Sequence, residues 1–123
     1  ILNVERIDHG IRCLEDPALV ERLRSTQTPL TVCPLSNIKL KVFPQMADHN
    51  IVAMDRAGLC VTINSDDPAY FGGYINENFA AVQRAFDLDQ AALVQYATRS
   101  VEASFASGER KRALREEIIQ ATS

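Results

Sequence analysis

Two adjacent carboxylates follow a short apolar segment in the middle of the chain. The residues Cys60-Val61-Thr62-Ile63 lead into Ser65-Asp66-Asp67-Pro68. Carboxylates at the end of a buried strand lose hydration and repel each other, so a chain normally keeps them there only where a cation or a substrate uses their charge. In an extended segment the two side chains point to opposite sides, so one could bind a metal while the other hydrogen-bonds a ligand. The alternative is a solvated Asp-Asp-Pro turn that begins a helix.

A histidine follows another apolar segment, in Arg6-Ile7-Asp8-His9-Gly10. At the end of a strand, His9 could ligate zinc, transfer a proton or hold a hydroxide. The alternative is a histidine whose ring bonds a backbone carbonyl. Ser36 and Asn37 are expected to end a further strand, where they could orient a neighbouring carboxylate or simply begin a polar loop. His49 lies beside Asp48 and Asn50, and we expect it to be a surface or helix-face residue.

The elements that must position these residues are short apolar segments alternating with amphipathic ones. Strands are expected at residues 1–7, 30–33 and 59–63. Helices are expected from Asp16-Pro17 to Thr26, over 46–57 with Gly58 as the cap, over 77–86, from a capping box at Asp87 and Gln90 to Ser100, and over 109–120. The stretches 36–44 and 64–73 are expected to be loops.

Strands that alternate with helices predict a parallel sheet covered on both sides. Active sites in such folds lie at the carboxyl ends of the strands. The three polar clusters, at His9-Gly10, Ser36-Asn37 and Asp66-Asp67, all fall at expected strand ends. The sequence therefore predicts one shared site.

The composition and charge of the chain argue against several classes of protein. The chain has 123 residues, 46% of them hydrophobic, which suits one α/β domain over residues 1–123. A net charge of −3 argues against a nucleic-acid partner. No apolar run approaches the roughly 20 residues that span a membrane. Cys13, Cys33 and Cys60 form no Cys-x-x-Cys pair, so we expect buried free thiols in a reducing cytoplasm rather than cysteine-ligated zinc.

Three motifs of the chain resemble those of the adenosine/adenine deaminase family, and they follow one another in the same order as in that family. They are residues 6–10, the segment Cys33-Pro34-Leu35-Ser36-Asn37, and the segment Asn64-Ser65-Asp66-Asp67-Pro68. The continuation to Tyr74 looks closer to the adenine deaminase branch. The resemblance covers nearly the whole chain and corresponds to about the C-terminal third of such an enzyme. It implies the last three βα units of a (β/α)8 TIM barrel, followed by C-terminal helices.

The resemblance also implies a role for each site residue. Asp66 resembles the zinc ligand, and Asp67 resembles the carboxylate that pairs with N7 of the purine. His9 resembles the histidine that positions and assists the attacking hydroxide, and Ser36 resembles the serine that supports the metal-binding aspartate. The implied reaction is hydrolytic deamination of adenine to hypoxanthine and ammonia, with one Zn²⁺ as cofactor.

The family's His-x-His pair, its further histidine ligand and its catalytic glutamate have no counterpart in this sequence. We therefore expect the chain alone to be inactive and to bind zinc weakly. It would need the rest of the barrel, as an N-terminal part or a separate chain, or would self-associate. Adenosine deaminase is the alternative with the same chemistry. A magnesium-dependent phosphotransferase or phosphatase that uses Asp66 and Asp67, and a non-catalytic βα module, are alternatives of other classes.

Overall fold

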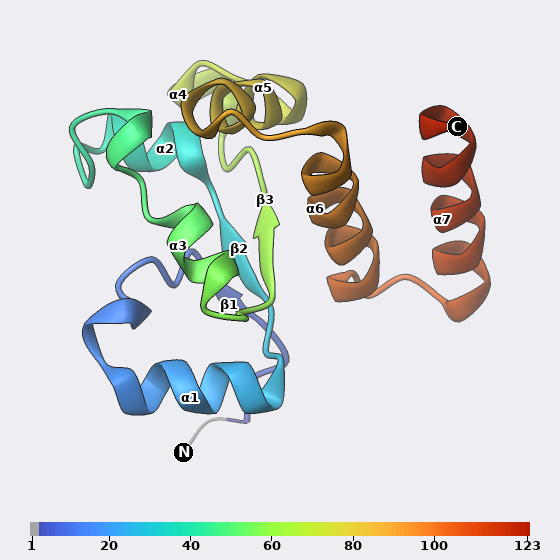
Figure 1. Cartoon of the computed structure of the whole chain (residues 1–123), viewed down its shortest axis with the longest axis horizontal. Coiled ribbons are helices and arrows are strands. Elements are labelled where there is room, and N and C mark those ends of the chain that lie inside the picture. The colour runs from blue at the N-terminus through green and yellow to red at the C-terminus, as the bar shows by residue number, and fades with distance from the viewer. Residues whose placement is uncertain (1–2) are drawn as a thin grey trace.

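Three short parallel strands form the centre of the chain. The computed structural model describes residues 3–123. The strands β1 (Ile7–Asp8), β2 (Leu30–Val32) and β3 (Val61–Ile63) pair in chain order, with Leu30 opposite both Ile7 and Val61. Figure 1 shows them side by side, with helices in the connections. The strands expected at 30–33 and 59–63 are therefore confirmed as β2 and β3. Of the strand expected over residues 1–7, only Ile7 lies in β1: residues 3–6 are not strand, and residues 1–2 lie outside the described part of the chain.

The connection from β1 to β2 begins with the turn η1 (Cys13–Glu15) and continues in helix α1 (Pro17–Thr26). The Asp16 carboxylate accepts hydrogen bonds from the backbone N–H groups of Ala18 and Leu19, and Pro17 takes the first helical position. This start is the predicted one, because an Asp N-cap followed by Pro satisfies the free N–H groups of the first turn.

The connection from β2 to β3 differs from the expectation at two places. Residues 34–39, expected to be mostly loop, form helix α2 (Pro34–Lys39). The predicted helix over 46–57 is interrupted: the turn η2 (Met46–Asp48) ends at His49, whose backbone is extended, and α3 (Ile51–Arg56) begins after it. The ring of His49 accepts the N–H of Ile51, and this bond fixes the start of α3.

After β3 come four helices: α4 (Pro68–Phe71), α5 (Ile75–Phe86), α6 (Gln90–Ala103) and α7 (Gly108–Thr122). Asp67 caps the single turn α4 within the stretch expected to be loop. The predicted capping box at Asp87 is wrong, because Asp87 ends α5 in a left-handed conformation and Asp89 caps α6 instead. In Figure 1, α6 lies next to the sheet and α7 packs on the outer side of α6.

The two faces of the sheet differ in polarity. On one face, Leu30, Val32, Val61 and Ile63 are almost fully buried in the hydrophobic core. The other face carries polar side chains from alternate positions, since successive strand residues point to opposite sides. There Asp8 is exposed and Thr31 is only half-buried, so the expectation of cover on both sides is not met over β1 and β2.

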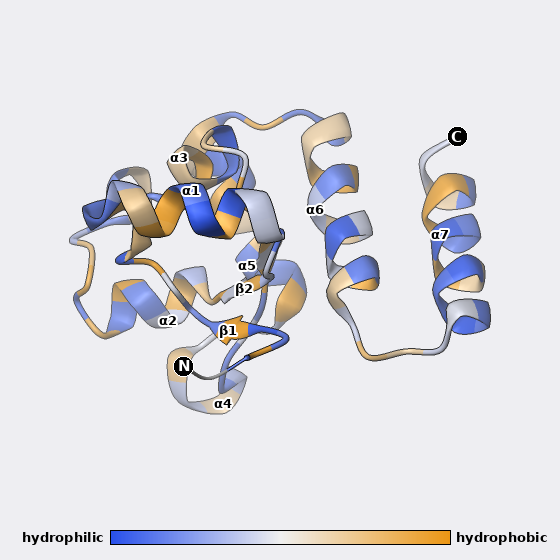
Figure 2. Cartoon of the chain, turned by 90° about the horizontal axis from the view of Figure 1, so that it is seen from below, coloured by the Kyte–Doolittle hydropathy of each residue, from blue (hydrophilic) through white to orange (hydrophobic). Residues whose placement is uncertain are grey.

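Hydrophilic and hydrophobic residues alternate along α1, α6 and α7 (Figure 2). Across residues 3–123, no helix combines the length and the apolar character that crossing a membrane requires.

Candidate active site

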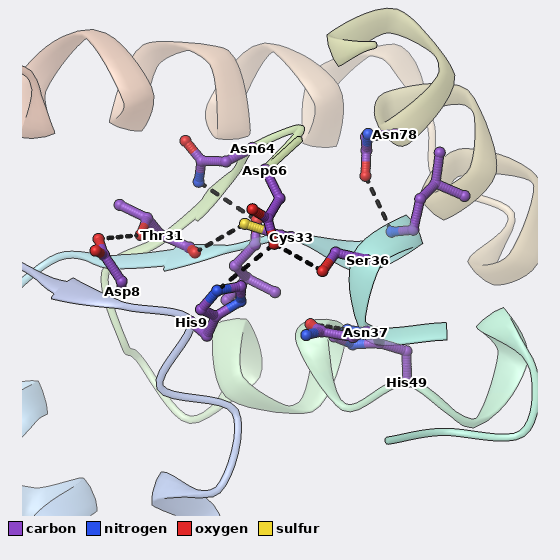
Figure 3. Close-up of polar contacts among 12 residues, drawn as sticks. Asp8, His9, Thr31, Cys33, Ser36, Asn37, His49, Asn64, Asp66 and Asn78 are labelled. Atoms are coloured by element: carbon purple, nitrogen blue, oxygen red, sulfur yellow. Dashed lines mark hydrogen bonds and ion pairs between the residues drawn. The ribbon is translucent and has the colours of Figure 1, made fainter. Parts of the chain in front are cut away.

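The polar clusters expected at the strand ends meet at one place. A hollow of about 310 Å³ opens at the carboxyl ends of the three strands. It is lined by Arg6, Asp8, His9, Thr31, Cys33, Asn64 and Asp66. Figure 3 shows the side chains of His9, Cys33, Ser36 and Asp66 pointing toward one another from three different segments. The shared site predicted from the spacing of the motifs is thus present as a geometric cluster.

Asp66 lies at the centre of this cluster. Its backbone is left-handed, with φ of 57°, a conformation that costs energy for any residue other than glycine. Its carboxylate is held by Ser36, whose hydroxyl donates a 2.7 Å hydrogen bond to Oδ2 (Figure 3). A charged acceptor makes such a bond short and strong. The turn and the hydroxyl together hold the Asp66 carboxylate in one orientation.

His9 approaches Asp66 from β1. His9 and Gly10 both have a left-handed backbone, and the His9 N–H donates to the Thr31 carbonyl at 3.0 Å. This turn brings His9 Nε2 to 3.8 Å from Asp66 Oδ2, beyond hydrogen-bond distance. The other ring nitrogen, Nδ1, is buried and has no hydrogen-bond partner among the described residues. The alternative of a ring that bonds a backbone carbonyl is therefore not observed in residues 3–123.

Cys33 is a member of the cluster that the sequence reasoning did not include. Its Sγ, one ring nitrogen of His9 and one carboxylate oxygen of Asp66 all lie within 4.8 Å of one another. Burial, with the Asp66 and Asp8 carboxylates adding to it, raises the pKa of the Cys33 thiol to about 12. The Cys33 thiol is buried and is not part of a disulfide, as expected. Its position directly after β2 is the sequence signal that could have placed it at the site.

Asp67 has partners different from those of Asp66. It is exposed, and its Oδ1 accepts the N–H of Tyr70 at 3.0 Å as the N-cap of α4. The two carboxylates therefore diverge as expected, but through the left-handed turn at Asp66 rather than through an extended strand. The alternative of an Asp-Asp-Pro turn that begins a helix describes Asp67 correctly and Asp66 incorrectly.

A second histidine, His49, bonds helix α2, which carries Ser36 of the cluster. His49, expected to be a surface or helix-face residue, is buried, and its Nε2 lies 3.0 Å from Asn37 Oδ1. Because Nδ1 accepts the N–H of Ile51, the ring proton sits on Nε2 and is donated to Asn37. Burial lowers the pKa of His49 to about 4, so the ring is neutral. The hydrogen bond fixes α2, the helix that carries Ser36. Ser36 and Asn37 lie within this buried helix rather than at a strand end.

The donor set fits one side of a metal site. Protein ligands lie about 2.0–2.3 Å from a zinc ion, so two donors on one ion are separated by about 4 Å or less. The 3.8 Å between Asp66 Oδ2 and His9 Nε2 meets that limit, and the orphaned Nδ1 shows that the ring of His9 is not committed elsewhere. One carboxylate and one imidazole do not complete a catalytic zinc site, which uses three protein ligands.

Comparison with known proteins gives concordant matches. The model of one protein family, described as adenosine deaminase, matches residues 1–121. An adenine deaminase of Hahella chejuensis is 59% identical over 111 residues, which is 90% of this chain and 33% of that protein. A crystal structure of adenine deaminase from Arthrobacter aurescens superposes with a TM-score of 0.96 at 47% identity, over 99% of this chain and 37% of that one.

A crystal structure of an amidohydrolase from Burkholderia ambifaria, with bound zinc, has the same fold over 96% of this chain and 33% of its own, with a TM-score of 0.82 at 24% identity. The chain spans about a third of the length of the relatives it matches. Its sheet is accordingly part of a TIM barrel.

Proposed function

Because this chain belongs to the adenosine deaminase family, we propose that it is a C-terminal portion of a zinc-dependent adenine deaminase. The observation that carries the proposal is that His9 and Asp66 meet at the carboxyl ends of parallel strands, where TIM-barrel enzymes have their active sites, and that Ser36 reaches Asp66 there from helix α2. The high identity to adenine deaminases supports adenine as the substrate. Residues 1–123 would then be one continuous part of a single barrel domain.

The contacts of each residue support its proposed role. Asp66 would hold the zinc ion through its carboxylate, and Ser36 would keep that carboxylate oriented through its 2.7 Å hydrogen bond. His9 would stand beside the attacking water, with Nε2 able to hold or take a proton. Asp67, exposed beside α4, would accept a hydrogen bond from the purine ring. The remaining zinc ligands would come from outside this chain.

The proposed reaction is hydrolysis at C6 of adenine. Water adds to C6 and the C6–N6 bond breaks, so adenine and water give hypoxanthine and ammonia. When bound, zinc supplies a Lewis acid that lets water ionise near neutral pH. His9 would take part in proton transfer next to C6, while Ser36 keeps the Asp66 carboxylate in its orientation.

Two measurements on the full-length enzyme test this function. Metal analysis of the purified protein is expected to find one zinc per chain, and adenine is expected to be turned over faster than adenosine. Adenosine as the better substrate would favour the adenosine deaminase alternative. Dependence on magnesium would favour a phosphotransferase or phosphatase. Replacement of Asp66 by Asn, if it changed neither metal content nor turnover, would leave only the non-catalytic module.

The described portion by itself is proposed to be inactive and to need the rest of the barrel, from the same or another chain, or a second copy. Three strands do not close a barrel. An apolar hollow of about 240 Å³, lined among others by Ile7, Leu19 and Leu23, lies between β1 and α1. A purified 123-residue chain with added zinc is expected to show no adenine turnover, and turnover would refute this part of the proposal. Its three free cysteines support a reducing location such as the cytoplasm.

A further inference from the structure

Helix α2, which carries Ser36, has no cap of its own. Cys33 at the N-cap position makes no side-chain capping bond, and Pro34 at the first helical position has no N–H. The next N–H, that of Leu35, is accepted by Asn78 Oδ1 at 3.0 Å. Asn78 lies on α5, 43 residues further along the chain. The cap of α2 is therefore supplied by a distant helix (Figure 3).

The amide nitrogen of Asn78 ties down a second segment. Nδ2 donates to the Tyr74 carbonyl at 2.9 Å and to the Gly73 carbonyl at 3.3 Å. These two residues connect α5 to α4, the turn that Asp67 caps. Asn78 is fully buried, and both ends of its amide are bonded. A buried amide with all its partners in place holds its neighbours in one arrangement.

We propose that Asn78 is a positioning residue for both carboxylates of the site. Through Leu35 it holds α2, so that Ser36 stays within hydrogen-bond distance of Asp66. Through Gly73 and Tyr74 it holds the segment that follows the turn capped by Asp67. Asn78 itself touches neither carboxylate, and acts on them through these two backbone links. This inference rests on the proposed function, in which Asp66 binds zinc and Asp67 binds the purine.

The two links make separable predictions for two variants of the full-length enzyme. Asn78→Ala removes both links. It is expected to weaken zinc affinity, measured by competition with a chelator, by up to about 10-fold, because Asn78 acts on Asp66 through α2 and Ser36 rather than directly. It is also expected to raise KM for adenine. Asn78→Asp keeps an oxygen for the Leu35 N–H and loses the donor to Gly73 and Tyr74. It is expected to raise KM with a smaller loss of zinc affinity.

Asn76→Ala is the matched control, because Asn76 lies on the same helix and is exposed. It is expected to change neither zinc affinity nor KM. Circular dichroism identifies the variants that fold, and if Asn78→Ala does not fold, Asn78→Asp still tests the KM effect. A folded Asn78→Ala protein with unchanged zinc affinity and KM overturns the positioning role. If the zinc-loaded wild-type enzyme does not turn over adenine, the proposed function is contradicted instead. The comparison of zinc affinity between the wild type and Asn78→Ala still tests the positioning role.

Discussion

Ser36 Oγ donates a 2.7 Å hydrogen bond to Asp66 Oδ2 and so joins helix α2 to the turn after β3, 30 residues away. Ser36 is fully buried, whereas the Asp66 side chain is 30% exposed toward the site hollow. The bond therefore fixes a carboxylate from its buried side and leaves its other side open to a ligand. An oriented carboxylate of this kind binds a metal more tightly than one that must be ordered on binding.

Replacement of Ser36 by Ala is expected to reduce the zinc affinity of the full-length enzyme about 10-fold or more, because the carboxylate loses its orienting donor. Chelator competition measures this affinity directly. Ser25→Ala is the control, since Ser25 is exposed on α1 and its hydroxyl donates to the Arg22 carbonyl of the same helix. An affinity equal to that of the wild type would show that the hydrogen bond does not prepare Asp66 for metal.

Asp67→Asn separates substrate binding from metal binding. Asn caps a helix about as well as Asp, so α4 is expected to remain formed. The lost charge is expected to lower kcat/KM for adenine about 10- to 100-fold, the usual value of a hydrogen bond to a charged group. Zinc content should stay at the wild-type level. Loss of zinc together with activity would mean that both carboxylates serve the metal.

The site was predictable from the sequence where its positions follow from strand ends. His9 and Asp66 lie within three residues of the ends of expected strands, and parallel strands bring their carboxyl ends to one edge. The start of α1 was equally predictable, because Asp16 and Pro17 form a local capping signal. In both cases the deciding information lies within a few residues of the element concerned.

Two of the incorrect predictions, those for helix α2 and for His49, have the same physical cause, which is a partner distant in the sequence. Helix α2 was not expected because its cap comes from Asn78 on another helix. His49 was placed on the surface from its polar neighbours, although it is buried against Asn37. Local propensity does not contain such bonds, and tertiary contacts override it at these positions.

His49 predicts a dependence of stability on pH. Its pKa is about 4 in the folded chain against 6.5 for an ordinary histidine. Above pH 6.5 the ring is neutral in both the folded and the unfolded state, so protonation of His49 takes nothing from the free energy of unfolding. As the pH falls from 6.5 to about 4, the unfolded state takes up a proton first, and the free energy of unfolding is expected to fall by about 3 kcal/mol.

Urea denaturation of the full-length enzyme across this pH range, with a chelator present to remove the contribution of metal, measures the effect. His49→Gln is the control, because glutamine takes up no proton and can still donate to Asn37. Between pH 6.5 and 4, the free energy of unfolding is expected to fall less in this variant than in the wild type, because the proton uptake by His49 is absent. Equal slopes for both proteins would show that His49 is protonated without cost in the folded state.

Gly10 offers a test of the turn that positions His9. Its φ is 69°, and a Cβ atom there would lie 2.8 Å from Cδ2 of the fully buried Leu30. Gly10→Ala is therefore expected to cost about 2 kcal/mol or more of stability, from the left-handed backbone and the crowding together. It should also lower adenine turnover, because relief of the crowding moves His9.

Gly108→Ala is the matched control: its Cβ would meet nothing within 4 Å at the start of α7, and stability is expected to stay equal or rise by about 0.4–1 kcal/mol. Thermal unfolding of both variants decides the matter, and a Gly10→Ala protein as stable and active as the control would mean that the turn at His9 adapts freely.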